Sequence, residues 1–476
     1  MYTRVASLVV GCVGVCSFSF AELGFQPPGT EKVNDSGLVH NFNSLLTESY
    51  KGAFSLDTYK TASHPDFTGK SYQAKFYNDD DSIPGLYGGF SFGEDRDVFF
   101  LTGNTGYFDG EPNTSIAQFS IPPLVKNTDP SNRSGISVAQ QLQPWKSIFK
   151  SRNGLTESDG GGGEFVGGMH FDHETGLLCV TTIQGYDAYP HSQDNVMCFE
   201  DPNELANSKV RGYYSFKREG AGDNEAAQVA SWITDIPRAW MEKLGGRLAF
   251  GGGKSGSIVS RLPTGPTLYT GSLDNLPVSG DVVINRYMAV YDQRGKHMGA
   301  HYFPEQSASG WMNYEWYNCN RFDVTPYDCG QALTDSSQVD AWINDWFTTH
   351  AHAVIGFIIP GTRTYAVLGT LGGGKGGSSY KGTPDHYSNR CPGPCRVQFD
   401  DVHNKYWLFD LNDILTASNP WEVFPYEHGT LPFLDQLSSG QNARSLMLNA
   451  AFDLKTGRLG IIMRWRDGQV SPLADV

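Results

Sequence analysis

The fold of this chain is decided by two octapeptides that repeat one pattern, Phe171-Asp-His-Glu-Thr-Gly-Leu-Leu178 and Phe452-Asp-Leu-Lys-Thr-Gly-Arg-Leu459. They match at Phe, Asp, Thr, Gly and the final Leu, and an apolar stretch follows each, at residues 179–183 and 460–463. The pattern is typical of a hairpin whose glycine takes a positive φ and closes the turn. The repeat therefore predicts the same strand–turn–strand unit at two distant places in the chain.

Further strand and turn patterns occur along the rest of the sequence. Hairpin units are indicated at residues 90–100 and 399–409, and single strands at residues 287–291, 353–359 and 364–369. Repeated hairpins spread over about 400 residues favour a β-propeller, in which each sheet buries its faces against neighbouring blades. At roughly 60 residues per blade, about seven blades fit. We expect an all-β fold, a single seven-bladed β-propeller over residues 22–476, with short helices in loops at residues 235–244 and 335–347.

The composition excludes several classes of protein. The 476 residues include 55 Gly, 10 Trp, 23 Tyr and 28 Phe, and the formal net charge is −15. High glycine and aromatic content with few charges excludes a disordered chain. Sustained heptads and apolar runs long enough for a transmembrane helix are both missing from the sequence. An acidic chain is a poor binder of nucleic acid. We therefore expect no nucleic-acid or membrane partner, and a monomer.

The first 21 residues are typical of an export signal. Arg4 provides a basic start, residues 5–20 are apolar or small, and Ser19-Phe-Ala21 offers small residues for cleavage. A lipoprotein signal ending at Cys12 is a weaker alternative, because the apolar stretch before it is short. The sequence therefore predicts a secreted protein, extracellular or periplasmic, whose mature chain begins near residue 22.

Six cysteines remain after residue 21, and two interpretations of them stay open. They are Cys179, Cys198, Cys319, Cys329, Cys391 and Cys395. An even number in an exported chain favours disulfides, here three pairs that are local in sequence. Alternatively, His386, Cys391 and Cys395 form a structural zinc site, with Cys319 or Cys329 as a fourth ligand. No organic cofactor is expected; the glycine-rich loop around Lys254 is not a phosphate-binding Walker loop, because Leu248 occupies the position of its first glycine.

Groups able to move protons gather around residues 170–191. On a strand, His170 and Asp172 would share one face while Phe171 points the other way. The following hairpin leads to a loop that contains Tyr186, Tyr189 and His191, so one hairpin can bring His170 and His191 together. The alternative is that His170 bonds to Asp172 or to backbone, and that His191 is a surface residue.

Cations follow in the next part of the sequence. Lys254 lies in a glycine-rich loop, and Arg261 lies between a short strand and a turn. The planar guanidinium of an arginine suits bidentate capture of a carboxylate or a sulfate. Arg261 could instead pair with a structural aspartate. Because the whole chain is acidic, a polyanion would have to bind in a local cationic cleft, to which Arg218 and Lys254 are expected to contribute.

Several blocks in this order resemble one known family, the secreted seven-bladed β-propellers that include the ulvan lyases and many uncharacterised relatives. The blocks are residues 167–178 with 186–187, 236–266, 360–364, 406–426 and 452–457, and the resemblance runs from about residue 85 to the C-terminus. It implies β-elimination on an anionic uronic-acid polysaccharide such as ulvan. Some family members also hold a structural zinc through His and Cys, which supports His386, Cys391 and Cys395 as ligands.

The resemblance also implies residue roles. His170 and His191 fall on the two histidine positions of the family, and Arg261 falls on its arginine position. The family's tyrosine is missing between Trp240 and Gly252, so Tyr189 is the expected substitute in catalysis. Lys254, Tyr186 and Arg218 are expected to bind substrate. The sequence thus predicts a polysaccharide lyase; the alternatives are a carbohydrate-binding propeller without catalysis and a glycoside hydrolase that uses two carboxylates.

Overall fold

The structure is a computed structural model of the whole chain. It describes residues 14–19, 37–50, 52–56, 61–63, 71–73, 89–95, 97–103, 107–108, 111–112, 115–124, 137–147, 164–184, 196–217, 229, 231–252, 265–274, 279–289, 351–371, 381–383, 395–398, 403–420, 422–435 and 446–464. No helix in these ranges is both long enough and apolar enough to cross a membrane.

Most described residues belong to β-sheets, five of which have four or five strands. The first sheet contains β5 (Phe90–Phe92), β6 (Val98–Gly103), β9 (Ser115–Ser120) and β11 (Lys146–Ser147). The second contains β12 (Glu164–Phe171), β13 (Leu178–Gln184), β14 (Val196–Phe199), β15 (Val210–Lys217) and β19 (Ser279–Val283). The third contains β16 (Trp232–Asp235), β17 (Leu248–Gly251), β18 (Leu268–Gly271) and β20 (Asn285–Met288).

The other two large sheets come from the ends of the chain. One contains β21 (His352–Ile358), β22 (Thr364–Leu371), β25 (His403–Asp410) and β26 (Glu427–Thr430). The other has the order β10 (Ser137–Ala139), β2 (Ala53–Leu56), β1 (Gly14–Ser19), β28 (Arg458–Arg464) and β27 (Leu446–Asp453), so it joins strands from both ends of the sequence. Strand β1 overlaps the predicted export signal, and it pairs with β2 and β28.

The smaller elements lie between these strands. Three two-stranded sheets pair β3 (Thr61–Ser63) with β4 (Ser71–Gln73), β7 (Tyr107–Phe108) with β8 (Glu111–Pro112), and β23 (Lys381–Thr383) with β24 (Cys395–Gln398). The short helices are α1 (Phe42–Glu48), η3 (Pro202–Glu204), α2 (Arg238–Leu244), α5 (Leu411–Thr416) and α6 (Pro432–Asp435). The helix expected at residues 235–244 is shorter at its start, because Asp235 ends β16 by pairing with Leu248, and Pro237 precedes the helix.

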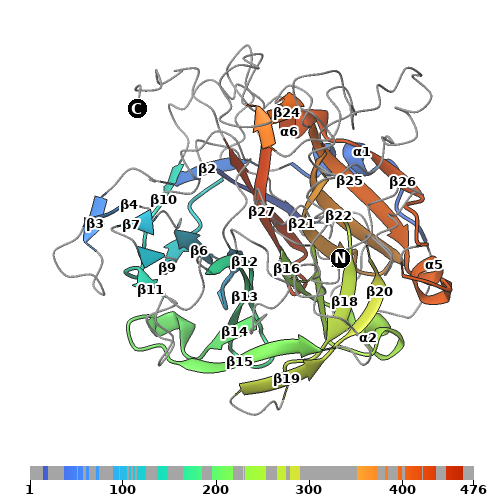
Figure 1. The fold of residues 1–476 in the computed structure, drawn as a ribbon. Helices are drawn as coiled ribbons and strands as arrows, with labels where there is room; N and C mark the ends of the chain where they lie inside the picture. Colours follow the sequence, from blue (N-terminus) through green and yellow to red (C-terminus); the bar gives the residue numbers. More distant parts are fainter. Residues whose placement is uncertain are drawn as a thin grey trace, which may run out of the picture.

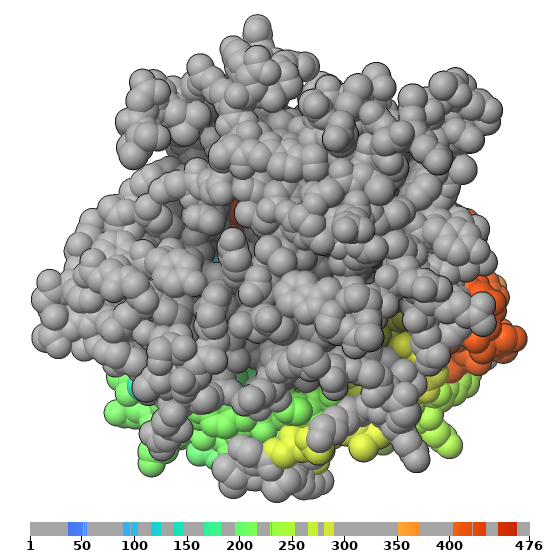
Figure 2. Space-filling view, in the orientation of Figure 1, coloured from blue at the N-terminus to red at the C-terminus, as the bar shows by residue number. Residues whose placement is uncertain are grey.

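The five large sheets are arranged like the blades of a propeller. One edge strand of each sheet, which we call its inner strand, contacts the inner strands of its neighbours in the cyclic order β5, β12, β16, β21, β27 and back to β5. Figure 1 shows β12, β16, β21 and β27 near the middle of the molecule. Strands β15 and β19 lie at the outer edge, where they form part of the lower rim in Figure 2 (green and yellow). The mostly β, propeller-like fold is confirmed. Seven blades are not confirmed, since the described residues supply five.

The two repeated octapeptides form equivalent turns, as predicted. They connect β12 to β13 and β27 to β28, and Gly176 and Gly457 have φ angles of 71° and 65°. In the first turn Asp172 accepts hydrogen bonds from the backbone of Glu174 and the hydroxyl of Thr175. Asp453 accepts from Lys455 and Thr456 in the same way. The aspartate at the end of each inner strand thus holds its own turn.

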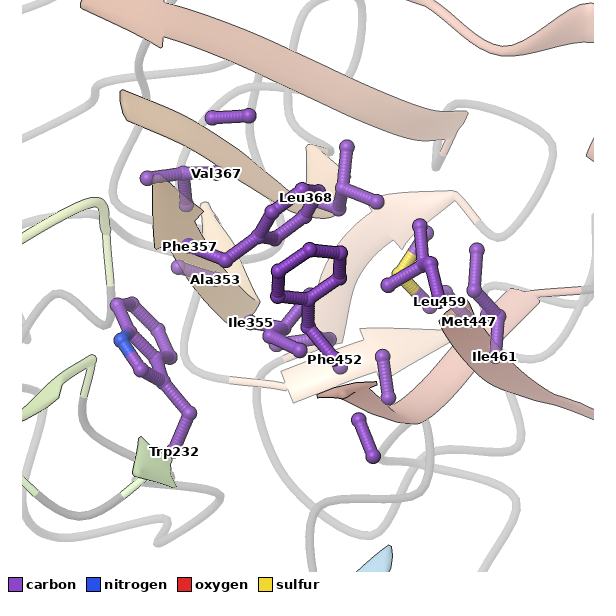
Figure 3. Packing of buried hydrophobic residues seen from close by; sticks show 14 of the residues in the cluster. Trp232, Ala353, Ile355, Phe357, Val367, Leu368, Met447, Phe452, Leu459 and Ile461 are labelled. Carbon is purple, nitrogen blue, oxygen red and sulfur yellow. The ribbon is translucent and has the colours of Figure 1, made fainter. Parts of the chain in front are cut away.

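Apolar side chains fill the middle of the ring. Phe357 of β21 and Phe452 of β27 stack with their ring centroids 4.4 Å apart. Figure 3 shows these two rings beside Ile355 and Leu459, with Trp232 of β16 near the same strands. All five side chains are buried. The inner strands are therefore tied together by a common core, which fixes how their ends are placed.

Neighbouring inner strands run in the same direction. Gly168 of β12 lies so close to Ser231 that a Cβ on it would come within 2.5 Å of the Ser231 carbonyl oxygen. Further along, His170 of β12 contacts Asp235 at the end of β16. We call the end of the ring with residues 171, 235 and 453 the turn face, and the opposite end, with residues 164, 232 and 446, the loop face.

A disulfide joins Cys179 of β13 to Cys198 of β14, which face each other across the sheet. This confirms one of the three expected local pairs. Cys319, Cys329 and Cys391 lie outside the described residues, and the side chain of Cys395 is not described. The choice between disulfide and zinc at Cys391 and Cys395 therefore stays open.

Candidate functional site

His170 lies next to the last residue of β12, near the turn face, and is only 5% exposed. Its Nε2 atom is 3.3 Å from Oδ1 of Asp235, on the neighbouring sheet. The geometry of this contact does not make a hydrogen bond, and the buried Nε2 has no hydrogen-bond partner among the described residues. The adjacent Phe171 packs into an apolar core that its sheet shares with the neighbouring sheet of β6 and β9. The predicted alternation therefore holds here, and it turns His170 toward a carboxylate of the next sheet.

Arg247 connects the same two sheets at this point. It precedes β17, and its Nη1 and Nη2 donate to Oδ1 and Oδ2 of Asp172 at 2.8 and 2.6 Å. The same guanidinium donates to Asp274 from Nε at 3.0 Å and from Nη2 at 2.6 Å. Its Nη1 also lies 3.7 Å from Asp235. Two aspartates therefore occupy the donors of Arg247, which is 7% exposed in its side chain.

The charges around His170 favour its protonated form. Burial alone would lower the pKa of the imidazole, but the carboxylates of Asp235 and Asp172 raise it above the ordinary value, against repulsion from Arg247. Burial likewise favours neutral Asp172, but the hydrogen bonds from Arg247 and Thr175 outweigh it and lower the pKa of that carboxyl. His170, Asp172, Asp235 and Arg247 thus form a buried charged cluster between two sheets, which we call the His170 cluster.

A second histidine–aspartate contact lies on the turn face. Nε2 of His173 is 3.5 Å from Oδ1 of Asp453, which belongs to the other copy of the repeated turn. Burial would raise the pKa of Asp453, but hydrogen bonds from His173 and Thr456 lower it. The end of β12 and the turn after it therefore touch two other sheets, through His170 in the strand and His173 in the turn.

Three residues of the described chain are close enough to hold a metal ion. One donor atom from each of His170, Asp172 and Asp235 lies within 4.8 Å of the other two. However, both oxygens of Asp172 already accept two hydrogen bonds each, from Arg247 and from its own turn. A metal ion would have to displace these donors and tolerate the guanidinium beside it. The donor set therefore suits the bound arginine better than a cation.

Most of the predicted site residues lie outside the described residues. These are His191, Tyr189, Arg261, Lys254, Tyr186, Arg218, His386 and Cys391. Cys395 begins β24, and its side chain is not described. Of the predicted catalytic residues, the structure therefore describes His170 alone, and it places this residue with Asp172, as predicted, and with Asp235 and Arg247.

The described strand ends show where the predicted loops are attached. Gln184, the last described residue before the loop that contains His191, pairs with Glu164 on the loop face. Glu164 is six residues from His170, or about 20 Å along the strand. The chain re-enters the sheet at Val196, opposite Thr181 and closer to His170. The loop that contains Lys254 and Arg261 begins after Gly252, also at the loop face.

The sequence reasoning missed Asp235 and Arg247 beside His170, and Asp274 as a partner of Arg247. Asp235 follows the short stretch Trp232-Ile-Thr234 just as Asp172 follows Met169-His-Phe171 at the end of β12, and this parallel was an available signal. Arg247 is 75 residues from Asp172, and local sequence carries no signal for that contact. A groove of about 830 Å³ is lined by Phe171 together with the carboxylates Glu94, Glu200, Asp201 and Glu204, and His170 is not among its lining residues.

Comparison with known proteins gave no match, either to a protein-family model or to a curated protein.

Proposed function

We propose that this protein is a secreted polysaccharide lyase that cleaves an anionic, uronic-acid-containing polysaccharide such as ulvan by β-elimination. The proposal rests on the resemblance of the sequence blocks to the ulvan-lyase propellers, which also carries the seven-blade expectation. The observation that supports it most is the pairing of His170 with Asp235. A histidine near the axis of a propeller-like ring, held against a carboxylate of the next sheet, is suited to proton transfer.

The reaction needs three groups. A cation neutralises the uronate carboxylate, so that the adjacent C5 proton becomes more acidic. A base removes that proton, and the electrons of the C5–H bond form the C4–C5 double bond while the bond from C4 to the glycosidic oxygen breaks. An acid protonates the departing oxygen. In this proposal Arg261 is the cation, His170 and His191 share the acid and base roles with Tyr189, and Lys254, Tyr186 and Arg218 bind the polymer.

The second candidate is a carbohydrate-binding propeller without catalysis. Two observations favour it. His170 is 5% exposed, and the cation beside it, Arg247, is fully engaged by Asp172 and Asp274. The His170 cluster itself therefore has no charge left with which to neutralise a uronate. In the first proposal, elimination depends on residues outside the described ranges, Arg261 above all.

The test is to incubate the purified protein with ulvan and other polyuronates and to follow the ultraviolet absorbance of the unsaturated uronate product. His170→Gln should lose roughly 100- to 10,000-fold in rate, as expected for removal of an acid–base group. His173→Gln is the matched control, since His173 sits in the same turn but contacts Asp453. Absence of product with every polymer, together with tight binding of one, would select the second candidate.

A further inference from the structure

We propose that Asp235 is a positioning residue for His170, and that it keeps the imidazole protonated so that His170 serves as the general acid of the elimination. The catalytic part of this assignment, the role of His170 as general acid, rests on the proposed function. Its physical part, the protonated state of His170, stands on the geometry of the His170 cluster alone.

The contact is built by the fold rather than by local sequence. Asp235 ends β16 and His170 lies near the end of β12, and the parallel course of these strands places the two side chains 3.3 Å apart. Asp235 is 15% exposed in its side chain and His170 is 7% exposed, so little water screens them. A carboxylate this close, in a site this dry, stabilises a charged imidazole over a neutral one.

The charges that face His170 sum to −1 when the imidazole is neutral. Asp235 from β16 and Asp172 from the turn after β12 bring two negative charges, and Arg247 before β17 brings one positive charge. A protonated His170 makes the buried group neutral. Asp274 and Glu174 contact Arg247 from farther out, and both add negative charge. Every charged residue described around the cluster except Arg247 therefore favours the imidazolium.

The position of the carboxylate also selects the nitrogen that can react. Nε2 of His170 lies 3.3 Å from Oδ1 of Asp235, so in this proposal Nδ1 is the atom left to transfer a proton. As the acid, Nδ1–H gives its proton to the departing glycosidic oxygen, and His170 becomes the neutral tautomer with its proton on Nε2, which Asp235 stabilises. The base that takes the C5 proton is then a different residue, and in the proposed function His191 and Tyr189 are the residues left for that role.

The first measurement does not need activity. The Cε1–H resonance of His170, assigned with His170→Gln, is followed by NMR as the pH is raised. We expect the wild-type imidazole to stay protonated beyond the ordinary histidine range, and Asp235→Asn to move its midpoint to lower pH. Asp235→Glu, which keeps the charge, should restore much of the lost shift in the midpoint. Asp274→Asn is the matched control: it removes a carboxylate that contacts Arg247 and not His170, so it should move the midpoint less than Asp235→Asn does. If His170 in the wild-type protein titrates with a midpoint at or below that of an exposed histidine, the inference is overturned. This result does not depend on whether the variants fold.

The second measurement is the pH dependence of kcat on the best uronate polymer. If His170 is the acid, kcat falls on the alkaline side as His170 loses its proton, and Asp235→Asn shifts this alkaline limb to lower pH with little change in KM. An unchanged limb in Asp235→Asn contradicts the assignment. A high midpoint for His170 combined with no elimination product would leave the pairing intact and reject the proposed lyase function.

Discussion

Among single substitutions at the buried ion pairs of the described residues, Arg247→Met should destabilise the protein most. The substitution removes both hydrogen bonds to Asp172, at 2.8 and 2.6 Å, and leaves that carboxylate buried with 2% of its surface exposed. Breaking a buried pair by removing one partner costs about 3–5 kcal/mol. This is a large share of a total stability of about 5–15 kcal/mol.

Urea unfolding followed by tryptophan fluorescence measures the effect. Arg363→Met is the matched control, because the Arg363–Asp410 pair has a similar distance of 2.9 Å but a more exposed arginine, at 29%. Such a pair contributes about 1 kcal/mol or less. Adding Asp172→Asn to Arg247→Met removes the unpaired charge, so the double variant should recover part of the loss. If Arg247→Met unfolds within about 1 kcal/mol of Arg363→Met, the cluster does not hold the two sheets together.

Three further predictions concern the same region. The pKa of His170 is raised on folding, so its stabilising effect is fully present below the unfolded value of 6.5 and is lost as pH rises through the folded value; the stability of wild type relative to His170→Gln should therefore fall above neutral pH in urea titrations. Replacing Cys179 and Cys198 with alanine opens a link of 19 residues and should cost about 3 kcal/mol; an unchanged melting temperature after reduction would contradict this. Gly176→Ala should cost about 1–2 kcal/mol through its positive φ alone, because no atom lies within 4 Å of a Cβ there; a neutral result in urea unfolding would show that the turn relaxes.

The hairpin turns could be predicted from sequence because their determinants are local. Asp172, Thr175 and Gly176 lie within five residues, and each contributes a hydrogen bond or a positive φ to the same turn. The same holds for the local disulfide between Cys179 and Cys198. The number of blades could not be predicted in this way, because it depends on which distant strands become neighbours. The described residues form a cyclic set of five sheets, and the seven blades that the sequence predicts are not confirmed.

The candidate site shows the same difference between local determinants and contacts between distant parts of the chain. The two-residue period of a strand was enough to place His170 and Asp172 on one face, and their shared cluster bears this out. The partners that set the charge of His170 come from another sheet, 65 residues away for Asp235 and 77 for Arg247. Such contacts depend on how the sheets are ordered around the ring, and one local stretch of sequence holds no information about that order.

The most direct test of the central claim is to digest the best polyuronate in water enriched in heavy oxygen and to weigh the products by mass spectrometry. Elimination breaks the bond between C4 and the glycosidic oxygen without adding water. We therefore predict products that end in an unsaturated uronate and carry no heavy oxygen. Products without the unsaturated end, which carry one heavy oxygen for each cleaved bond at the new reducing end, would show hydrolysis by two carboxylates and would contradict the lyase assignment.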